Sequence, residues 1–304
     1  MQHIVLAQER WTSLDDSLII EADARIALCR LPDRSIQCCV TSPPYWSLRD
    51  YSIPAQIGLE ASVDQFVRHL TQCFAQVRRI LKDDGVLWLN IGDAYTSGDR
   101  GYRAPDRKNP VRAMTYRPDT PEGLKAKDLI GIPWKLAFAL QADGWYLRAD
   151  VIWHKPNCMP ESVKDRPTRS HEYMFLLSKS ERYYYNHEAV REENGRNRRS
   201  VWSIPTQPFE GAHFATFPPA LIEPCIRAGS RPGDFVLDPF FGSGTVGIAC
   251  GALGRRFVGI ELNPEYVRIA RRRLGTRGDG STSPSAPPTL ASASLNPAGG
   301  ARRC

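Results

Sequence analysis

The sequence predicts an α/β fold in which helices cover both faces of a mostly parallel, doubly wound sheet. Short apolar runs typical of buried strands alternate with longer segments of helical periodicity along most of the chain. Hydrophobic residues make up 42% of the 304 positions, which is enough to fill a sizeable core. A glycine-rich turn at 238–250 stands between a strand pattern and a helix pattern, where sheets of this kind bind ligands.

The first predicted elements are a strand, a short helix and a second strand. Residues 18–29 (LIIEADARIALC) begin with a short apolar strand and continue as a helix. Residues 36–41 (IQCCVT) form an almost unbroken apolar run, which is typical of a strand buried on both faces.

A long helix is predicted over 62–81. Its apolar residues recur at three- and four-residue steps, so they share one face. Ser62 and Gln65 form a capping-box pattern at its start. Gly85 lies just past its end, where a glycine often stops a helix.

The remaining elements continue the alternation of strands and helices. Strands are predicted at 86–91, 146–153, 172–178, 235–238 and 257–261, and helices at 133–142, from about 244, and at 264–274. Residues 275–304 are rich in Gly, Ser, Pro and Ala and poor in large apolar groups, so they are predicted to be a disordered tail.

Several classes of protein are excluded by composition. No apolar stretch approaches the ~18 residues that cross a membrane, and the N-terminus lacks the pattern of a signal peptide. The eight cysteines form no CxxC pair and no zinc-like array, which indicates reduced thiols in a cytoplasm. His154 and His171 have no acid or second histidine at ligand spacing, so no metal site is predicted.

One polar motif interrupts the apolar pattern early in the chain. The strand at 36–41 ends abruptly in TSPPYW, with Ser42 before two prolines and Tyr45 after them. Proline restricts φ, so Pro43 and Pro44 hold the backbone around Ser42 rigidly. Taken alone, the motif is also compatible with an ordinary proline-rich turn.

A second motif, DPFFGSGTVGIAC, surrounds the glycine turn. Gly242 and Gly244 permit a tight turn and a close approach of a ligand, and the following helix directs its N-terminal amides at it. The pattern is neither GxGxxG nor a P-loop. Glu261 ends the next strand, where an acid can bind ribose hydroxyls, and Asp238 can serve a charged group. A nucleoside-containing ligand such as S-adenosylmethionine fits, although an ordinary glycine turn stays the alternative.

Together the two motifs resemble those of DNA amino-methyltransferases. TSPPYW resembles their catalytic motif IV, and DPFFGSGT resembles motif I, which binds S-adenosylmethionine. Here motif IV precedes motif I, as in the circularly permuted β class. Further likenesses span about 18–274: ADARIALCRLPDRSI (22–36, with Ala22-Asp23 where Gly-Asp is usual), LKDDGVLWLNIGD (81–93), VIWHKPN (151–157), HFATFP (213–218, motif X) and VGIELNPEY (258–266, motif II).

The resemblance implies a Rossmann-like fold, S-adenosylmethionine as cofactor and a set of site residues. Ser42 and the Pro43 carbonyl would accept the hydrogens of an exocyclic amine, and Tyr45 would stack on a base flipped out of the duplex. Trp46 is expected to pack the loop. The catalytic residues are Ser42, Pro43, Pro44 and Tyr45; the cofactor residues are Asp23, Phe217, Pro218, Asp238, Pro239, Phe240, Gly242, Ser243, Gly244, Thr245, Glu261 and Asn263.

The first residue of motif IV bears on the substrate. Within the family, Ser there is usual for N4-cytosine enzymes and Asp for N6-adenine enzymes, so Ser42 implies N4-cytosine, with N6-adenine as the alternative. No Pro-Cys motif is present, whereas C5-cytosine methylation needs an activated thiol. A silent DNA-binding regulator and an RNA or protein methyltransferase are further alternatives, and the glycine pattern disfavours a nicotinamide oxidoreductase.

The resemblance also implies an organisation and a set of partners. Residues 1–274 would form the catalytic domain, with DNA-recognition segments inserted at about 97–128 and 155–199. Basic residues in these segments and a net charge of +7 suit binding to DNA. The expected context is a restriction–modification system, a phage or a mobile element, with double-stranded DNA, a cognate endonuclease and a homodimer as the expected partners.

Overall fold

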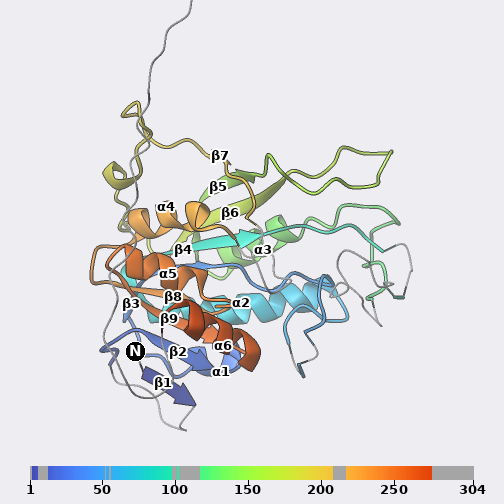
Figure 1. Cartoon of the computed structure of the whole chain (residues 1–304). Helices are drawn as coiled ribbons and strands as arrows, with labels where there is room; N and C mark the ends of the chain where they lie inside the picture. Colours follow the sequence, from blue (N-terminus) through green and yellow to red (C-terminus); the bar gives the residue numbers. More distant parts are fainter. Residues whose placement is uncertain are drawn as a thin grey trace, which may run out of the picture.

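A computed structural model describes residues 2–5, 13–51, 53–54, 56–97, 101–102, 117–207 and 217–275. These residues form a single nine-stranded sheet in the order β1-β2-β9-β8-β3-β4-β6-β5-β7 (Figure 1). The strands are β1 (Gln2–Val5), β2 (Leu18–Glu21), β3 (Ile36–Thr41), β4 (Leu81–Ile91), β5 (Tyr146–His154), β6 (His171–Ser178), β7 (Val201–Ser203), β8 (Phe235–Asp238) and β9 (Arg256–Glu261).

The sheet is mostly parallel, as predicted. Within the described part of the chain, β6 alone runs against its neighbours β4 and β5. Helices cover both faces: α1 (Ala24–Leu28), α2 (Val63–Ile80) and α3 (Ile132–Ala142) pack into one apolar core, and α4 (Pro219–Gly229), α5 (Thr245–Ala252) and α6 (Pro264–Arg273) into the other; η2 (Glu188–Val190) is a single 3₁₀ turn. The α/β doubly wound fold is therefore confirmed.

Alternate residues of the central strands serve the two cores. Cys39 of β3 faces the core beneath α2, whereas Cys38 and Val40 face the core beneath α4 and α5. All three side chains are fully buried. This double burial explains why β3 has no polar face and why its sequence is almost wholly apolar.

The long helix α2 forms where its periodicity predicts. Ser62 caps it by accepting a hydrogen bond from the Gln65 amide at 3.2 Å, a contact whose loss typically costs about 1 kcal/mol. The predicted stop at Gly85 is wrong, because the helix ends at Ile80 and β4 begins at once with Leu81. Gly85 instead lies within β4, where an added Cβ would come within 3.1 Å of the Gln37 carbonyl oxygen.

Two edge strands, one helix and the 3₁₀ turn η2 have no counterpart in the sequence prediction. The edge strands β1 and β7 contain only four and three residues, too few for a clear alternation. Helix α4 starts at Pro219 and carries Pro224 in its interior, where proline is normally unfavourable. Its apolar face, which includes Leu221 and Ile226, is completely buried against the sheet and stabilises the helix despite this proline.

The two sequence motifs follow strands that lie side by side at the centre of the sheet. Strand β3 pairs with β8, and the chain leaves them in opposite directions: β3 leads through α2 to β4, and β8 leads through α5 to β9. Such a reversal opens a crevice at the carboxyl ends of the two strands. TSPPYW and DPFFGSGT follow these two carboxyl ends.

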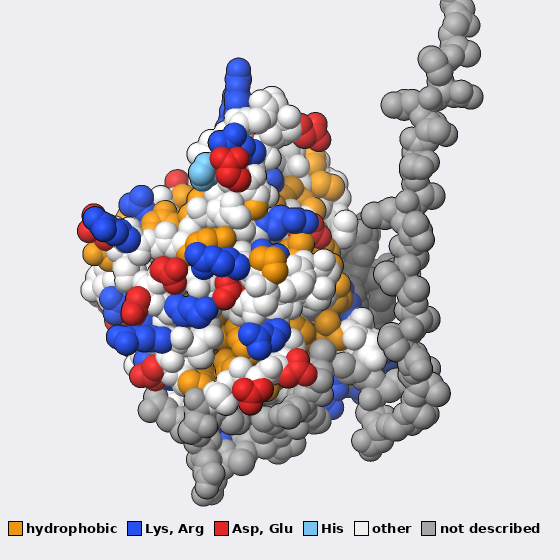
Figure 2. Space-filling view, turned by 90° about the vertical axis from the view of Figure 1, so that its left-hand side faces the viewer, with side chains coloured by type: hydrophobic (Ala, Val, Ile, Leu, Met, Phe, Trp, Pro, Cys, Tyr) orange, Lys and Arg blue, Asp and Glu red, His pale blue; other side chains and the backbone are white. Residues whose placement is uncertain are grey.

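Some of the sequence predictions fall outside the described residues. They concern residues 276–304 of the tail, residues 98–100 and 103–116 of the basic segment 97–128, and the first four residues of HFATFP. In the part of the chain that is described, no helix is both long and apolar enough to cross a membrane. On the face shown in Figure 2, basic and acidic side chains are interspersed.

Candidate active site

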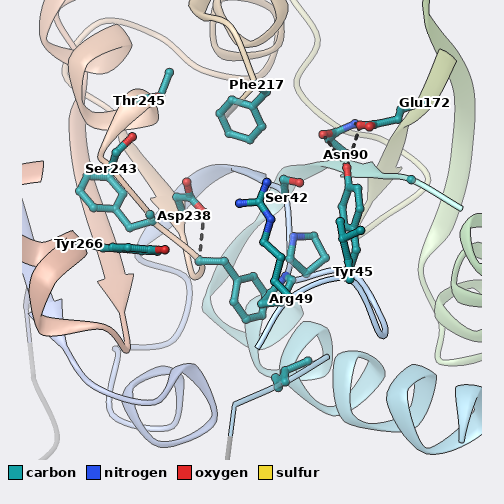
Figure 3. Close-up of a pocket in the computed structure, with 18 of the residues that line it drawn as sticks. Ser42, Tyr45, Arg49, Asn90, Glu172, Phe217, Asp238, Ser243, Thr245 and Tyr266 are labelled. Carbon is teal, nitrogen blue, oxygen red and sulfur yellow. Dashed lines mark hydrogen bonds between the residues drawn. The ribbon is translucent and has the colours of Figure 1, made fainter. Parts of the chain in front are cut away.

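A cavity of about 900 Å³ lies at the carboxyl edge of the sheet. Its walls come from the ends of β3, β4, β8 and β9, from the start of β6, and from the loops that follow them. Figure 3 shows Ser42 near the middle of this cavity, with Asp238, Ser243 and Tyr266 to one side and Asn90 and Glu172 to the other. The site therefore has two distinct halves that meet at Ser42.

The loop after β3 presents the TSPPYW motif to the cavity. Ser42, Pro43, Pro44 and Tyr45 all line it. The Tyr45 ring lies directly over Gly92, and its hydroxyl donates a 2.7 Å hydrogen bond to Oε2 of Glu172.

Contacts through Trp46, Glu60 and Gly58 also hold this loop in place. Trp46 is only 5% exposed and donates from Nε1 to the Glu60 carbonyl at 2.9 Å, so it packs the loop as expected. The Glu60 carboxylate accepts from the Gly58 amide at 2.9 Å and contacts Nδ1 of His69 at 3.0 Å. The Gly58 carbonyl in turn accepts from the Ser47 amide at 2.7 Å, which closes the loop.

The glycine turn after β8 has the backbone that its sequence predicts. Gly242 and Gly244 have φ values of 52° and 84°, in the left-handed region that favours glycine. The Phe241 ring packs on Gly259, where no larger residue fits. Arg273 of α6 donates to the Ser243 carbonyl at 2.7 Å and so ties the turn to the last helix.

The buried Asp238 and the partly exposed Glu261 are the last residues of β8 and β9. Asp238 accepts from the Thr41 hydroxyl at 2.7 Å and from the Phe240 amide at 3.1 Å. Burial raises the pKa of Asp238 to about 7, although the Thr41 hydroxyl opposes the shift. Glu261 accepts from the Gly242 and Asn263 amides, each at 2.7 Å, and burial raises its pKa to about 6. A cationic ligand would relieve this cost of burying charge.

Most of the predicted cofactor residues line the cavity. Gly244 and Pro218 do not: Gly244 precedes α5 and faces Ala270 of α6, while Pro218 precedes α4. The predicted cofactor residues on the cavity wall are Asp23, Phe217, Asp238, Pro239, Phe240, Gly242, Ser243, Thr245, Glu261 and Asn263.

Two of these lining residues also have local structural roles. Asn263 caps α6 through a 2.9 Å hydrogen bond from the Glu265 amide. Asp23 caps α1 and pairs with the guanidinium of Arg25. Their side-chain oxygens are therefore partly engaged within the protein.

Residues that the sequence prediction did not single out complete the cavity. Asn90, Lys155 and Glu172 form a hydrogen-bonded group beside Tyr45, while Arg49 and Tyr266 lie on the cofactor side. Asn90 and Lys155 lie in LNIGD and WHKPN, two stretches that carry the family resemblance. The resemblance could therefore have pointed to both residues. No sequence motif marked Glu172, which is the second residue of the mostly apolar strand β6.

The segment 155–199 contains β6 and so has two separate loop parts. Residues 155–170 join the end of β5 to the start of β6 at the cavity edge, and Lys155, Asn157 and Met159 line the cavity. The part after β6 starts from the opposite edge of the sheet, where the Tyr184 amide donates to the carbonyl of Asp84. Within the described residues, no group of three or more His, Cys, Asp or Glu side chains could hold a metal ion.

Comparisons with known proteins identify the family. A DNA methylase family model of the N6/N4 type matches residues 36–272. The chain is 66% identical over 265 residues to the Type II methyltransferase M.Cfr9I of Citrobacter freundii, covering 86% of this chain and 88% of that protein. It is 58% identical over 269 residues to the Type II methyltransferase M.SmaI of Serratia marcescens, covering 86% of this chain and 92% of that protein.

Solved structures show the same fold. PvuII DNA methyltransferase, described as cytosine-N4-specific, aligns with a TM-score of 0.66 at 21% identity over 86% of this chain and 87% of that chain. A Thermus thermophilus protein solved in complex with S-adenosyl-L-methionine aligns with a TM-score of 0.59 at 26% identity, over 84% of this chain and 92% of that chain. The chain thus belongs to the N6/N4 DNA methylase family and is a DNA methyltransferase whose cofactor is S-adenosylmethionine.

Proposed function

We propose that this enzyme methylates the exocyclic N4 of cytosine in duplex DNA, on a base that it first flips out of the helix. The observation that carries the proposal is Ser42: a neutral hydroxyl stands between the two halves of the cavity, at the position where a carboxylate is usual in N6-adenine enzymes. Assignment to the permuted β class is part of the proposal and rests on the order of the two motifs.

The half of the cavity that contains Asp238 and Glu261 suits the cofactor. S-adenosylmethionine supplies an electrophilic methyl group on a sulfonium and also carries a ribose and an ammonium group. Asp238 would hold a cationic group, and Glu261 would accept hydrogen bonds from hydroxyls, as the acid at this point of a Rossmann-like sheet does. The left-handed turn at Gly242 leaves room for close approach of the cofactor.

The half that contains Tyr45 suits the base. In a cytosine, the N4 lone pair is delocalised into the ring, which makes the amine a poor nucleophile. Ser42 Oγ and the Pro43 carbonyl would accept the two amine hydrogens and favour a tetrahedral nitrogen. Attack by the amine would form the N–C bond while the S–C bond of bound S-adenosylmethionine breaks, which leaves S-adenosylhomocysteine. The methylated amine would then release one proton to water. Held in line at about 3–3.5 Å, the two reacting atoms need little further reorganisation.

The thiols next to the motif are unsuited to covalent catalysis. Cys38 and Cys39 are fully buried in β3, and burial raises the pKa of both thiols well above the usual value. A thiol that resists deprotonation is a weak nucleophile. This supports direct transfer to an amine over C5 methylation through an enzyme adduct.

The target must leave the duplex to reach Ser42, because its amine is otherwise paired inside the helix. We infer that Tyr45 replaces the lost stacking, at about 1–3 kcal/mol for a base on an aromatic ring. Residues 155–170 and the described part of 97–128 would contact the DNA, since both flank this side of the cavity. Lys127 and Asp165 join these two loops at 2.7 Å.

The biological setting follows from the relatives. Two close relatives are Type II methyltransferases, which supports a restriction–modification role for this chain, in a prokaryotic or phage-infected cytoplasm beside a cognate endonuclease. A catalytic domain at 1–274 with inserted recognition segments, and a homodimeric assembly, complete the proposal.

The test is the chemical identity of the methylated base. DNA from cells that express the protein is digested and analysed by nucleoside mass spectrometry, with cells expressing Ser42→Ala as the control. N4-methylcytosine that appears with the native protein and falls with the variant would support the proposal. N6-methyladenine without N4-methylcytosine would overturn the choice of base and leave the adenine alternative.

A further inference from the structure

Glu172 is the centre of a hydrogen-bonded group on the base side of the cavity. Its Oε2 accepts from the Tyr45 hydroxyl at 2.7 Å and from Nδ2 of Asn90 at 3.2 Å, while its Oε1 pairs with Nζ of Lys155. We call these four residues the Glu172 cluster. It joins the catalytic loop, β4, the end of β5 and the start of β6, which are far apart in the sequence.

The Glu172 cluster is largely, but not completely, shielded from solvent. The Glu172 and Lys155 side chains are 17% and 16% exposed, and all four members line the cavity. Figure 3 shows Asn90 and Glu172 on the opposite side of Ser42 from Asp238. A base whose amine lies at Ser42 would therefore have this cluster, and not the cofactor acids, beside the rest of its ring.

Hydrogen-bond donors in the cluster are mostly occupied. Asn90 donates to Glu172 and to the Tyr173 carbonyl, and Tyr45 donates to Glu172. Lys155 differs, because an ammonium group has three hydrogens. Among the described residues, Nζ of Lys155 has one hydrogen-bond acceptor, Glu172, and it also stands 4.1 Å from the centroid of the Trp153 ring.

Cytosine needs donors at this position. Its pairing edge carries the N4 amine, then the N3 and O2 acceptors in succession. When the base leaves the duplex, N3 and O2 lose the donors of the partner guanine, and an acceptor left unpaired inside a pocket weakens binding of the base. Ser42 and Pro43 offer acceptors to the amine, so a donor further along the wall is still required.

We propose that Lys155 supplies this donor by binding the N3–O2 edge of the flipped cytosine, and that Glu172 is a positioning residue that orients both Lys155 and the Tyr45 ring. The inference rests on the proposed function and specifies how that site selects its base. Adenine offers only N1 beside its amine and a C–H group where cytosine has O2, so the second contact favours cytosine.

The test separates a contact with the base from a structural ion pair. Glu172→Gln keeps an oxygen for Tyr45 and Asn90 but turns a donor amide toward Lys155. In the double variant Lys155→Met with Glu172→Gln, the new amide no longer faces an ammonium group. The methionine also keeps an unbranched apolar side chain against the Trp153 ring. If the pair is only structural, the double variant transfers methyl groups at least as fast as Glu172→Gln alone.

If Lys155 contacts the base, the double variant is slower than Glu172→Gln by roughly tenfold or more, as expected for losing a charge-assisted hydrogen bond. The measurement is single-turnover transfer of labelled methyl from S-adenosylmethionine to unmethylated bacterial DNA. Cofactor Kd stays within about twofold of the native value, because the cofactor half is untouched. Lys155→Arg, which keeps donors at this position, retains more activity than Lys155→Met.

Equal rates for the double variant and Glu172→Gln would overturn the proposal. This result is distinct from failure of the proposed function, which nucleoside analysis of the native product reports separately. N6-methyladenine as the sole product would remove the cytosine assignment and, with it, the role of Lys155 at O2. Thermal unfolding of each variant shows whether a slow rate reflects loss of the fold.

Discussion

Thr41 Oγ1 donates a 2.7 Å hydrogen bond to Oδ1 of Asp238, and both residues are buried at the carboxyl ends of neighbouring parallel strands. Ser42 follows Thr41 directly, and Asp238 begins the glycine turn. One hydrogen bond thus joins the residue next to Ser42 to the acid that begins the glycine turn. We expect it to fix the separation between the two halves of the site.

Replacing Thr41 by Val tests this coupling. The variant keeps the shape but leaves Asp238 without one donor, at a cost of about 1–3 kcal/mol in the free energy of unfolding. Because the Thr41 hydroxyl holds the pKa of Asp238 down, the pKa should rise further and cofactor binding should need a higher pH. Calorimetric titration with S-adenosylmethionine across pH measures the shift. Thr71→Val, which removes a hydrogen bond inside α2, should leave cofactor binding unchanged.

The raised pKa of Asp238, about 7 against an ordinary value of 3.8, makes stability depend on pH. The folded protein holds this proton more tightly than the unfolded chain does. Its contribution to stability is therefore complete below about pH 4 and is lost as the pH rises through about 7, by at most about 1.4 kcal/mol per pH unit. Urea unfolding of the ligand-free protein at pH 5 and pH 7.5, with Asp238→Asn as reference, checks the sign. A native protein that gains stability relative to the variant over this interval would contradict it.

Cofactor affinity should change with pH in the opposite sense. A cationic cofactor beside Asp238 favours the ionised carboxylate, so binding below about pH 7 should release a proton. Affinity should then increase as the pH rises toward neutrality and level off above it. Calorimetry in two buffers of different ionisation enthalpy measures the released proton directly. An affinity that is constant from pH 5.5 to about 8 would show that Asp238 is already ionised before the cofactor binds.

Ser42→Ala should slow methyl transfer without weakening cofactor binding. The variant loses one acceptor for the amine, which gains charge as it attacks; such a hydrogen bond is worth about 1.5–3 kcal/mol, or roughly a 10- to 100-fold decrease in rate. Single-turnover transfer measures the rate and equilibrium dialysis the cofactor Kd. A near-native rate would show that the Pro43 carbonyl suffices without Ser42.

Gly92→Ala should disturb the base side of the site alone. A Cβ at Gly92 would lie 2.7 Å from Cε2 of Tyr45, so the ring must move. A displacement of about 1 Å can lower turnover by roughly 100-fold when it misplaces the substrate. We expect a higher KM for DNA and a lower kcat, with cofactor Kd unchanged. Gly251→Ala, at an exposed position of α5 where an added Cβ meets no atom within 4 Å, is the matched control.

Local sequence patterns were sufficient to predict the elements that are long enough to show a repeating pattern of buried residues. Helix α2 has buried residues at regular steps over eighteen residues, and the turn at Gly242 and Gly244 has the positive φ values that only glycine adopts easily. The stop predicted at Gly85 failed because β4 begins directly after α2, so the glycine serves the strand. Helix α4 was missed because its interior Pro224 opposes the helix locally while burial against the sheet supports it.

The sequence by itself determined the fold class, the two motifs and, through their likeness to a family, the chemistry and the cofactor. These depend on neighbouring residues: apolar periodicity, rigid prolines and glycines with positive φ. Only the tertiary structure decided that Thr41 bonds Asp238 and that Glu172 gathers Tyr45, Asn90 and Lys155. Such contacts arise from strand order and direction, with β3 beside β8 and β6 antiparallel to β4, and no local propensity encodes which distant strands become neighbours.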